Sequence, residues 1–388
     1  MDTDINARFL TRDEATDWEI VANHFYGIKD ITEEQKELVR NAFSFLKNEL
    51  GENYLKEMES IHPMYFHIHN YVLASRLWFV ELAADIKRLK EFPNYKSLYR
   101  RLKNSRKFPE AFSVLELAIK FCKVGFNIEF DPNVKINGKP KEPDLKVINS
   151  SNTESFFCEV SVLNVSVIEQ NAMNSGMKLF NAVMSFPYLQ FAGKVERILD
   201  ENEIKNVSDQ IFELKKKVNE ESGFGELRIK DVLTLGLSSE ENKEQIVKWA
   251  KEHNCEVGNF EQPYFESNEL KRMKTKINEK RKQLPYDKPN LIMIYANTFF
   301  YTSGEPIHVI NELEKHLTKY KNINGVIIRG KFMGTIEPLI AKIKQHIFIQ
   351  KYQYDAYAEQ YLILWNMAGE KKFNDETKKS IIDSILFN

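Results

Sequence analysis

Two nearly uninterrupted runs of apolar residues in the C-terminal third of the chain restrict its possible fold most. They are NLIMIYANT, residues 290–298, and INGVIIRG, residues 323–330. Such runs are typical of strands that are covered on both faces inside a parallel sheet. The residues between them include HVINELEKHLTKY, 308–320, which has the apolar spacing of a helix. The order strand, helix, strand therefore predicts an α/β layer structure.

The pattern of the remaining residues predicts two domains, one of them interrupted. Residues 1–108 have helical spacing, with Thr32 at the capping-box-like start of one long helix. A helix that begins near residue 109 precedes several short β-like runs, so we expect 109–388 to form the α/β core. Polar and charged helical patterns predict a helical insertion within this core, at about 190–268.

Composition excludes several classes of protein. The chain has 388 residues, 43% of them hydrophobic, which is ordinary for a globular protein with a sizeable core. Its net charge of −1 gives no global sign of nucleic-acid binding, so any basic surface has to be local. Three widely spaced cysteines argue against a disulfide framework and against a cysteine-based zinc site. The polar N-terminus and the lack of a long apolar run predict a cytoplasmic protein without membrane contact.

Two carboxylates lie in a segment that has the pattern of a β-hairpin, PDLKVINSSNTESFFCEV. If the turn is centred on Ser151 and Asn152, Asp144 lies directly opposite Glu159 on one face. Two carboxylates that close repel each other unless a cation lies between them or one is protonated. The alternatives for Glu159 are a surface-facing acid on an edge strand and a simple ion pair with Lys146. The alternative for Asp144 is a turn residue only. A one-residue slip of the register would also separate the two acids.

A third acid, Glu116, lies in the preceding helix, in SVLELAIKF. Its position falls between Phe112 and Ile119 rather than on a polar side of that helix. Three carboxylates at one sheet edge would suit Mg²⁺ or Mn²⁺, which prefer oxygen ligands. The alternative is a helix with apolar residues all round, in which Glu116 has no special role.

These residues resemble the PD-(D/E)xK nuclease superfamily. Pro143 and Asp144 match its Pro-Asp pair, Glu159-Val160-Ser161 matches its acidic-x-Lys segment in part, and Glu116 matches its helical acid. The resemblance extends over 109–185 and 268–335. It implies a restriction-endonuclease-like core with a central mixed sheet. It also implies Mg²⁺-dependent or Mn²⁺-dependent hydrolysis of phosphodiester bonds, with Asp144, Glu159 and Glu116 as metal ligands.

The chain departs from this family where Ser161 replaces the motif lysine. Some family members carry the lysine on a neighbouring helix, and RMKTKINEKRKQLP offers a candidate. Lys280 interrupts a helical stripe of three apolar residues, Met273, Ile277 and Leu284. A buried lysine needs a partner, which a carboxylate cluster would provide, so Lys280 is the predicted catalytic lysine. The alternatives are a lysine whose stem is packed and whose ammonium is wet, and Lys276 in its place.

Two basic segments predict contacts with nucleic acid. The first is YKSLYRRLKNSRK and the second is ELKRMKTKINEKRKQ, which contains Lys280. Both could bind phosphates independently of base sequence, although each could equally be a solvated helix face. The predicted contact residues are Arg100, Arg101, Lys103, Lys276, Arg281 and Gln283.

Together these features lead us to expect a metal-dependent nuclease that acts on nucleic acid, DNA rather than RNA. A role in restriction or antiphage defence is an expectation from analogy alone. The helical domain would recognise DNA, a partner protein or a second copy of the chain. One alternative is a nuclease fold without catalysis that serves as a binding module, and Ser161 favours it. The other is an all-helical interaction protein with an incidental hairpin.

Overall fold

The computed structural model describes residues 10–11, 13–58, 62–149, 154–164, 167–261, 269–296, 306–333, 337–354 and 357–386. The chain divides into two compact units. We call 1–164 together with 270–388 the core unit, and 165–269 the inserted unit. Among the described residues, no helix has the length and apolar character needed to span a bilayer.

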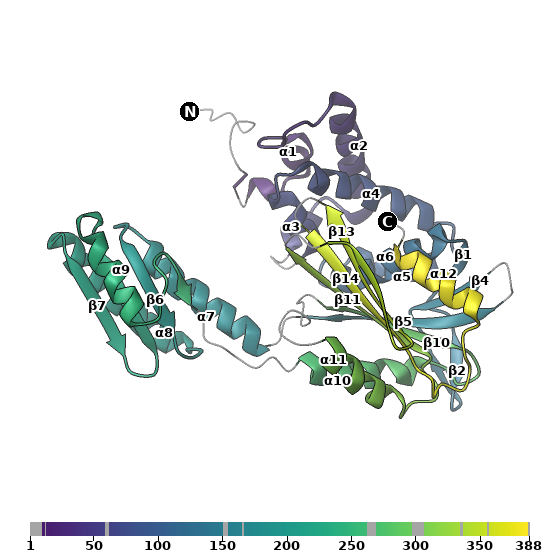
Figure 1. Cartoon of the computed structure of the whole chain (residues 1–388). Helices are drawn as coiled ribbons and strands as arrows, with labels where there is room; N and C mark the ends of the chain where they lie inside the picture. The colour runs from purple at the N-terminus through teal and green to yellow at the C-terminus, as the bar shows by residue number, and fades with distance from the viewer. Residues whose placement is uncertain are drawn as a thin grey trace. The chain divides into compact units, whose positions relative to one another are not determined.

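Eight strands form one mixed sheet in the core unit, in the order β1-β4-β5-β10-β11-β14-β13-β12 (Figure 1). The central strands β5, β10 and β11 are parallel, and every other neighbouring pair is antiparallel. The two apolar runs are β10 and β11, so the expected α/β class and mixed sheet are confirmed. The strands are β1 (Phe126–Phe130), β4 (Leu145–Asn149), β5 (Ser155–Leu163), β10 (Asn290–Ala296), β11 (Gly325–Met333), β12 (Leu339–Ile343), β13 (His346–Tyr354) and β14 (Tyr357–Trp365).

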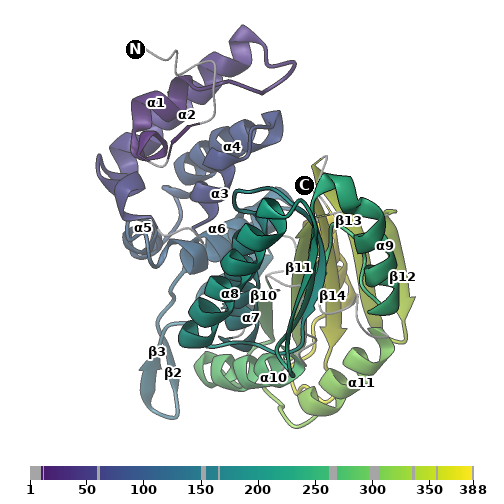
Figure 2. The ribbon, with the colours of Figure 1, turned by 90° about the vertical axis from the view of Figure 1, so that its left-hand side faces the viewer.

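Helices cover both faces of this sheet, which explains why β10 is buried along its whole length. Met273 and Ile277 of one helix pack with Phe157 and Ile292 on one face. Leu115 and Ile381 belong to the cluster that includes the alternate strand residues on the other face. Figures 1 and 2 show α10 and α11 side by side against the sheet. The covering helices are α10 (Glu269–Lys280) and α11 (Pro306–Leu317) on the first face, and α6 (Phe108–Lys123) and α12 (Asp375–Leu386) on the second.

The N-terminal helices belong to the core unit, whereas the sequence pattern predicts a separate domain that ends at residue 108. One hydrophobic cluster is continuous from Leu10 through α6 to the sheet, so the chain has no break in packing at that boundary. Thr32 caps its helix through the predicted capping box with Gln35. The helical elements are η2 (Glu14–Thr16), α1 (Trp18–Asn23), α2 (Glu33–Leu50), η3 (Tyr54–Glu57), α3 (Pro63–His69), α4 (Leu73–Leu89) and α5 (Tyr95–Leu102).

The inserted unit contains a four-stranded sheet, so the expectation of a helical insertion at about 190–268 has to be corrected. The sheet order is β7-β8-β6-β9. Its strands are short: β7 is exposed or half-exposed, whereas β6 and β8 are mostly buried and each contains a glycine. A Cβ atom on Gly236 would lie 2.7 Å from the Trp249 ring, so this glycine permits close packing of a helix. The elements are α7 (Val167–Met184), β6 (Gln190–Val195), α8 (Glu201–Glu220), β7 (Phe224–Ile229), β8 (Leu233–Ser238), η4 (Glu240–Asn242), α9 (Lys243–Glu252) and β9 (Phe260–Glu261).

A small hairpin and one helical turn complete the core unit. The hairpin joins β2 (Val134–Ile136) to β3 (Lys139–Lys141), and Figure 2 shows it as a separate projection. Its turn residues Asn137 and Gly138 both have positive φ, as a two-residue hairpin turn requires. The turn η5 (Arg281–Gln283) directly follows α10.

Candidate active site

The β4–β5 hairpin has the register that the sequence pattern predicts. Leu145 pairs with Cys158, and the next pair along the hairpin would be Asp144 and Glu159. The Asp144 carboxylate accepts a hydrogen bond from the Val160 backbone N–H at 2.9 Å, which fixes its position beside β5. The predicted turn at Ser151 and Asn152 lies outside the described residues.

Lys280, the last residue of α10, forms ion pairs with both carboxylates through its ammonium. Its Nζ lies 2.9 Å from Glu159 Oε2 and 3.5 Å from Asp144 Oδ2. Strand alternation explains the contact, because Glu159 shares a face with Phe157, which packs with the apolar residues of α10. The structure therefore brings together the three residues that the sequence nominated from distant segments.

The charges in this group determine its protonation. The Glu159 side chain is 1% exposed. Burial, and then the charge of Asp144, raise the pKa of Glu159 to about 8, although Lys280 opposes the shift. Burial alone would lower the pKa of Lys280, but the charges of Asp144 and Glu159 outweigh it and raise that pKa. Lys280 is thus a stable cation here, able to donate hydrogen bonds and unsuited to accept a proton.

A further acid, Glu110, lies beside this group and was not among the predicted site residues. Its Oε1 is 3.9 Å from Lys280 Nζ, and its side chain is 55% exposed. Glu110 occupies the first turn of α6, just after Pro109. This position in the sequence is only a weak indication of a site residue, because acids are common in the first turn of helices for general electrostatic reasons.

Glu116 does not belong to this carboxylate group, contrary to the prediction of a third metal ligand there. Its Oε2 lies 2.8 Å from Arg329 Nη1, and Arg329 also pairs with Glu359. Glu359 in turn accepts a hydrogen bond from the Tyr361 hydroxyl. The reason is geometric: α6 packs on the face of the sheet that carries Cys158 and Val160, opposite to the face of Glu159.

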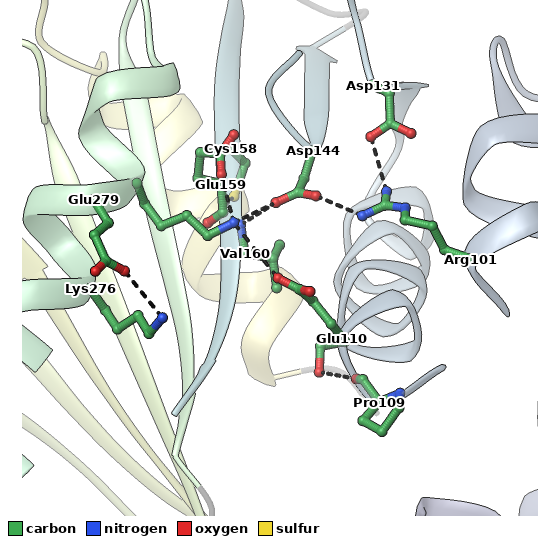
Figure 3. A network of polar contacts seen from close by, with 12 residues as sticks. Arg101, Pro109, Glu110, Asp131, Asp144, Cys158, Glu159, Val160, Lys276 and Glu279 are labelled. Carbon is green, nitrogen blue, oxygen red and sulfur yellow. Dashed lines mark hydrogen bonds and ion pairs between the residues drawn. The ribbon is translucent and has the colours of Figure 1, made fainter. Parts of the chain in front are cut away.

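Arg101 reaches the site from α5, although the sequence analysis assigned it to phosphate contact. Its two terminal nitrogens lie 3.1 Å from Asp144 Oδ1 and 3.0 Å from Asp131 Oδ1 (Figure 3). The helical spacing of α5 could have indicated this contact. Arg101 is three residues from the buried Leu98, so it lies near the inner side of the helix. Asp144 thus has a cation on each side, Lys280 and Arg101.

The other predicted nucleic-acid contacts lie outside this group. Arg100 and Lys103 are exposed on α5 and just after it. Lys276 pairs with Glu279 at 3.1 Å on the surface of α10. The Arg281 guanidinium stacks 4.3 Å from the centre of the Tyr320 ring. Gln283 is half-buried in η5, and Ser161 is 3% exposed on the same face of β5 as Glu159.

The donor atoms of this site suit a hard divalent cation. Asp144, Glu159 and Glu110 offer only carboxylate oxygens, which Mg²⁺ and Mn²⁺ prefer. The buried Glu159 Oε1 accepts no hydrogen bond from the described part of the chain, so it is available to a cation. In this structure the ammonium of Lys280 is the cation that contacts Asp144 and Glu159. No set of three metal-ligating side chains with suitable geometry occurs among the described residues.

Known proteins provide no further assignment of this site: no protein-family model and no curated protein matches the chain.

Proposed function

We propose that the chain is a metal-dependent nuclease with a restriction-endonuclease-like core, which hydrolyses phosphodiester bonds of nucleic acid. The observation that carries this proposal is the position of Lys280. Its ammonium meets Glu159 and Asp144 at 2.9 and 3.5 Å, although α10 lies far downstream of the hairpin. A buried acid pair with one lysine is the side-chain set that this chemistry requires, even though Ser161 stands in the motif position.

In this proposal each residue of the site has a separate role in metal binding or hydrolysis. Asp144 and Glu159 would hold Mg²⁺ or Mn²⁺, with Glu110 as a third oxygen donor. When bound, the ion would act as a Lewis acid and lower the pKa of water. Lys280 would orient the attacking water and stabilise negative charge on the phosphate, because its raised pKa keeps it protonated. Arg101 and the Val160 N–H would hold Asp144 in place.

The exposed cations of α5 support nucleic acid as the substrate. Arg100 is on the helix that supplies Arg101, and Lys103 directly follows that helix, so both lie on the segment that adjoins Asp144. Phosphate contacts of this kind position a strand independently of its base sequence. DNA is the first substrate to test, and a role in restriction or antiphage defence is a proposal from analogy alone.

A binding module without catalysis is the competing function. One observation favours it: Lys280 already contacts both acids, so the fold requires no metal to offset their repulsion. The two functions differ in their response to Mn²⁺. A nuclease binds Mn²⁺ at Asp144 and Glu159 and cleaves, whereas the module does neither.

The test is cleavage of plasmid, linear duplex, single-stranded DNA and RNA in Mg²⁺, Mn²⁺ or EDTA. Lys280→Ala should reduce cleavage roughly a hundredfold to a thousandfold, the usual cost of removing one donor that stabilises transition-state charge. Lys274→Ala, on the same helix and paired with Glu312 at 2.7 Å, is the matched control and should cleave like the wild type. Calorimetric titration with Mn²⁺ should show binding that Glu159→Gln abolishes. Absence of cleavage on every substrate would overturn the enzyme proposal.

A further inference from the structure

A hollow of about 750 Å³ opens beside α5, on the side of Asp131. We call it the α5 hollow. Its lining includes the aromatic rings of Phe92 and Tyr99, the amide of Asn94, and the cations Lys96 and Arg100. None of these residues belongs to the carboxylate group described above, so the hollow is a separate feature of the core unit.

Two consecutive ion pairs connect the hollow to the carboxylate group. Asp131 lines the hollow and receives a hydrogen bond from Ser97. Its carboxylate lies 3.0 Å from one nitrogen of Arg101, whose other nitrogen lies 3.1 Å from Asp144. Asp131 and Arg101 would therefore connect a ligand in the hollow with Asp144 of the proposed active site.

The charges of the lining select the kind of ligand. Glu49 is neutralised by Lys90 at 2.6 Å, and Asp131 is neutralised by Arg101. Lys96 and Arg100 remain exposed and free of acidic partners among the described residues. Glu142, a third acid of the lining, is also exposed. The hollow thus combines aromatic rings and an amide with two accessible cations and one exposed acid. Aromatic rings bind nucleobases by stacking, and exposed cations bind backbone phosphates.

We propose that the α5 hollow binds one nucleotide of the substrate strand, adjacent to the phosphate that water attacks at the carboxylate group. The base lies against Tyr99 and Phe92, and its phosphate lies at Lys96 and Arg100. This inference rests on the proposed function and makes it more specific. A base inside a duplex is stacked between its neighbours, so only an unpaired nucleotide can enter the hollow. The substrate is accordingly single-stranded, or unpaired next to the cleavage position.

Binding without cleavage gives the direct test. The full-length Glu159→Gln variant, in EDTA, is titrated with a fluorescent single-stranded oligonucleotide, with the matching duplex, and with AMP, ribose 5-phosphate and inorganic phosphate. We expect the single strand to bind at least tenfold more tightly than the duplex. AMP should bind more tightly than the two phosphates that lack a base. Equal affinity for AMP and inorganic phosphate would overturn the nucleotide assignment.

Variants locate the binding in the hollow. Tyr99→Leu should weaken AMP binding about tenfold, the usual effect of losing one stacking partner, and leave phosphate binding unchanged. Tyr99→Phe keeps the ring and should bind like the parent protein. Lys96→Ala with Arg100→Ala should weaken the single strand at least tenfold. Lys29→Ala with Lys372→Ala removes two exposed cations from other segments of the core unit and is the control for charge alone. Equal weakening by the two double variants would overturn the proposal.

The outcome separates this inference from the proposed function. Cleavage by the wild type with no effect of the hollow variants on binding or cleavage would reject the hollow and retain the nuclease. Nucleotide binding that Tyr99→Leu removes, without cleavage in any metal, would reject the nuclease and retain the hollow as a nucleotide site.

Discussion

Glu159 combines nearly complete burial with two charged neighbours, and its ionisation should influence stability. Its pKa in the folded, metal-free protein is about 8, against an ordinary value of 4.5, because of burial first and Asp144 second. The folded state therefore binds this proton more tightly than the unfolded state does. Between about pH 4.5 and pH 8 the unfolded chain carries fewer protons at this position, so the free energy of unfolding falls as the pH rises.

We predict that this fall is absent from Glu159→Gln, which cannot titrate. The free energy of unfolding in EDTA, measured with urea at several values from pH 5 to pH 8, should fall more steeply for the wild type. The difference in slope should approach about 1.4 kcal/mol per pH unit, the value for one proton. Only the slopes are compared, because the substitution also leaves Lys280 without its closest partner. Parallel curves would contradict the raised pKa.

At the scale of elements, α5 is tied to the β4–β5 hairpin by Arg101. The helix itself is short, with Leu98 and Leu102 fully buried, so it packs firmly enough to hold a guanidinium in place. Arg101 contacts no atom that would react. It therefore acts on the site through Asp144, as a positioning residue.

We predict that Arg101→Ala lowers the affinity for Mn²⁺ and lowers kcat, because Asp144 loses the charge-assisted hydrogen bond that orients it. The expected loss of metal affinity is about tenfold to a hundredfold, as for other residues that orient a ligand. Arg101→Lys should restore part of the affinity, since the charge remains and the two-pronged geometry is lost. Arg100→Ala, the neighbouring exposed arginine, is the control for Mn²⁺ affinity and should leave it unchanged. A change in KM for the nucleic acid alone would instead indicate a phosphate contact.

Helices and strands with regular spacing of apolar residues were predictable from the sequence. Lys280, which interrupts the apolar stripe of α10, was predictable for the same reason. The hairpin register and the helical stripe of α10 follow from side-chain alternation and apolar spacing, which is why Lys280 could be nominated as a partner of Glu159. Two acids of α6 were not predicted correctly: Glu110, which lies beside the site, was missed, and Glu116 was wrongly placed there. The two acids are separated by less than two turns of the helix. Their positions depend on which face of the sheet the helix covers, and no local pattern carries that information.

The strands of the inserted unit were missed for another physical reason. Three of them, β6, β7 and β8, are only six residues long, and β7 is mostly exposed or half-exposed. Charged residues such as Glu226 and Arg228 occupy the outer positions of β7, so the segment resembles the polar helices around it. Strand formation here depends on pairing between segments distant in sequence, which local propensity does not describe.

At the scale of the whole molecule, the small net charge conceals two oppositely charged units. The inserted unit, 165–269, contains 12 basic and 19 acidic residues, a net charge of −7. The core unit has the remaining 43 basic and 37 acidic residues, a net charge of +6. The unit that contains the candidate active site therefore has the sign of charge that favours an anionic polymer.

We predict that replacing 165–269 by a short Gly/Ser linker strengthens non-specific binding to DNA. The inserted unit has hydrophobic clusters of its own, so the core unit should fold without it. Removing a net charge of −7 should raise the affinity at 50 mM salt, and the difference should diminish as salt increases, because screening weakens it. Fluorescence anisotropy at several salt concentrations measures both effects. An affinity that is unchanged at low salt would contradict the prediction.

The position of Lys280 beyond the inserted unit also has a consequence for synthesis on the ribosome. Asp144 and Glu159 leave the ribosome before Lys280, which is separated from them by the entire inserted unit. At usual elongation rates this interval is roughly 6 to 24 s. During that time the nascent chain lacks both β10, the parallel neighbour of β5, and the ammonium that belongs between the two acids. The site is thus completed only after the whole inserted unit has been synthesised.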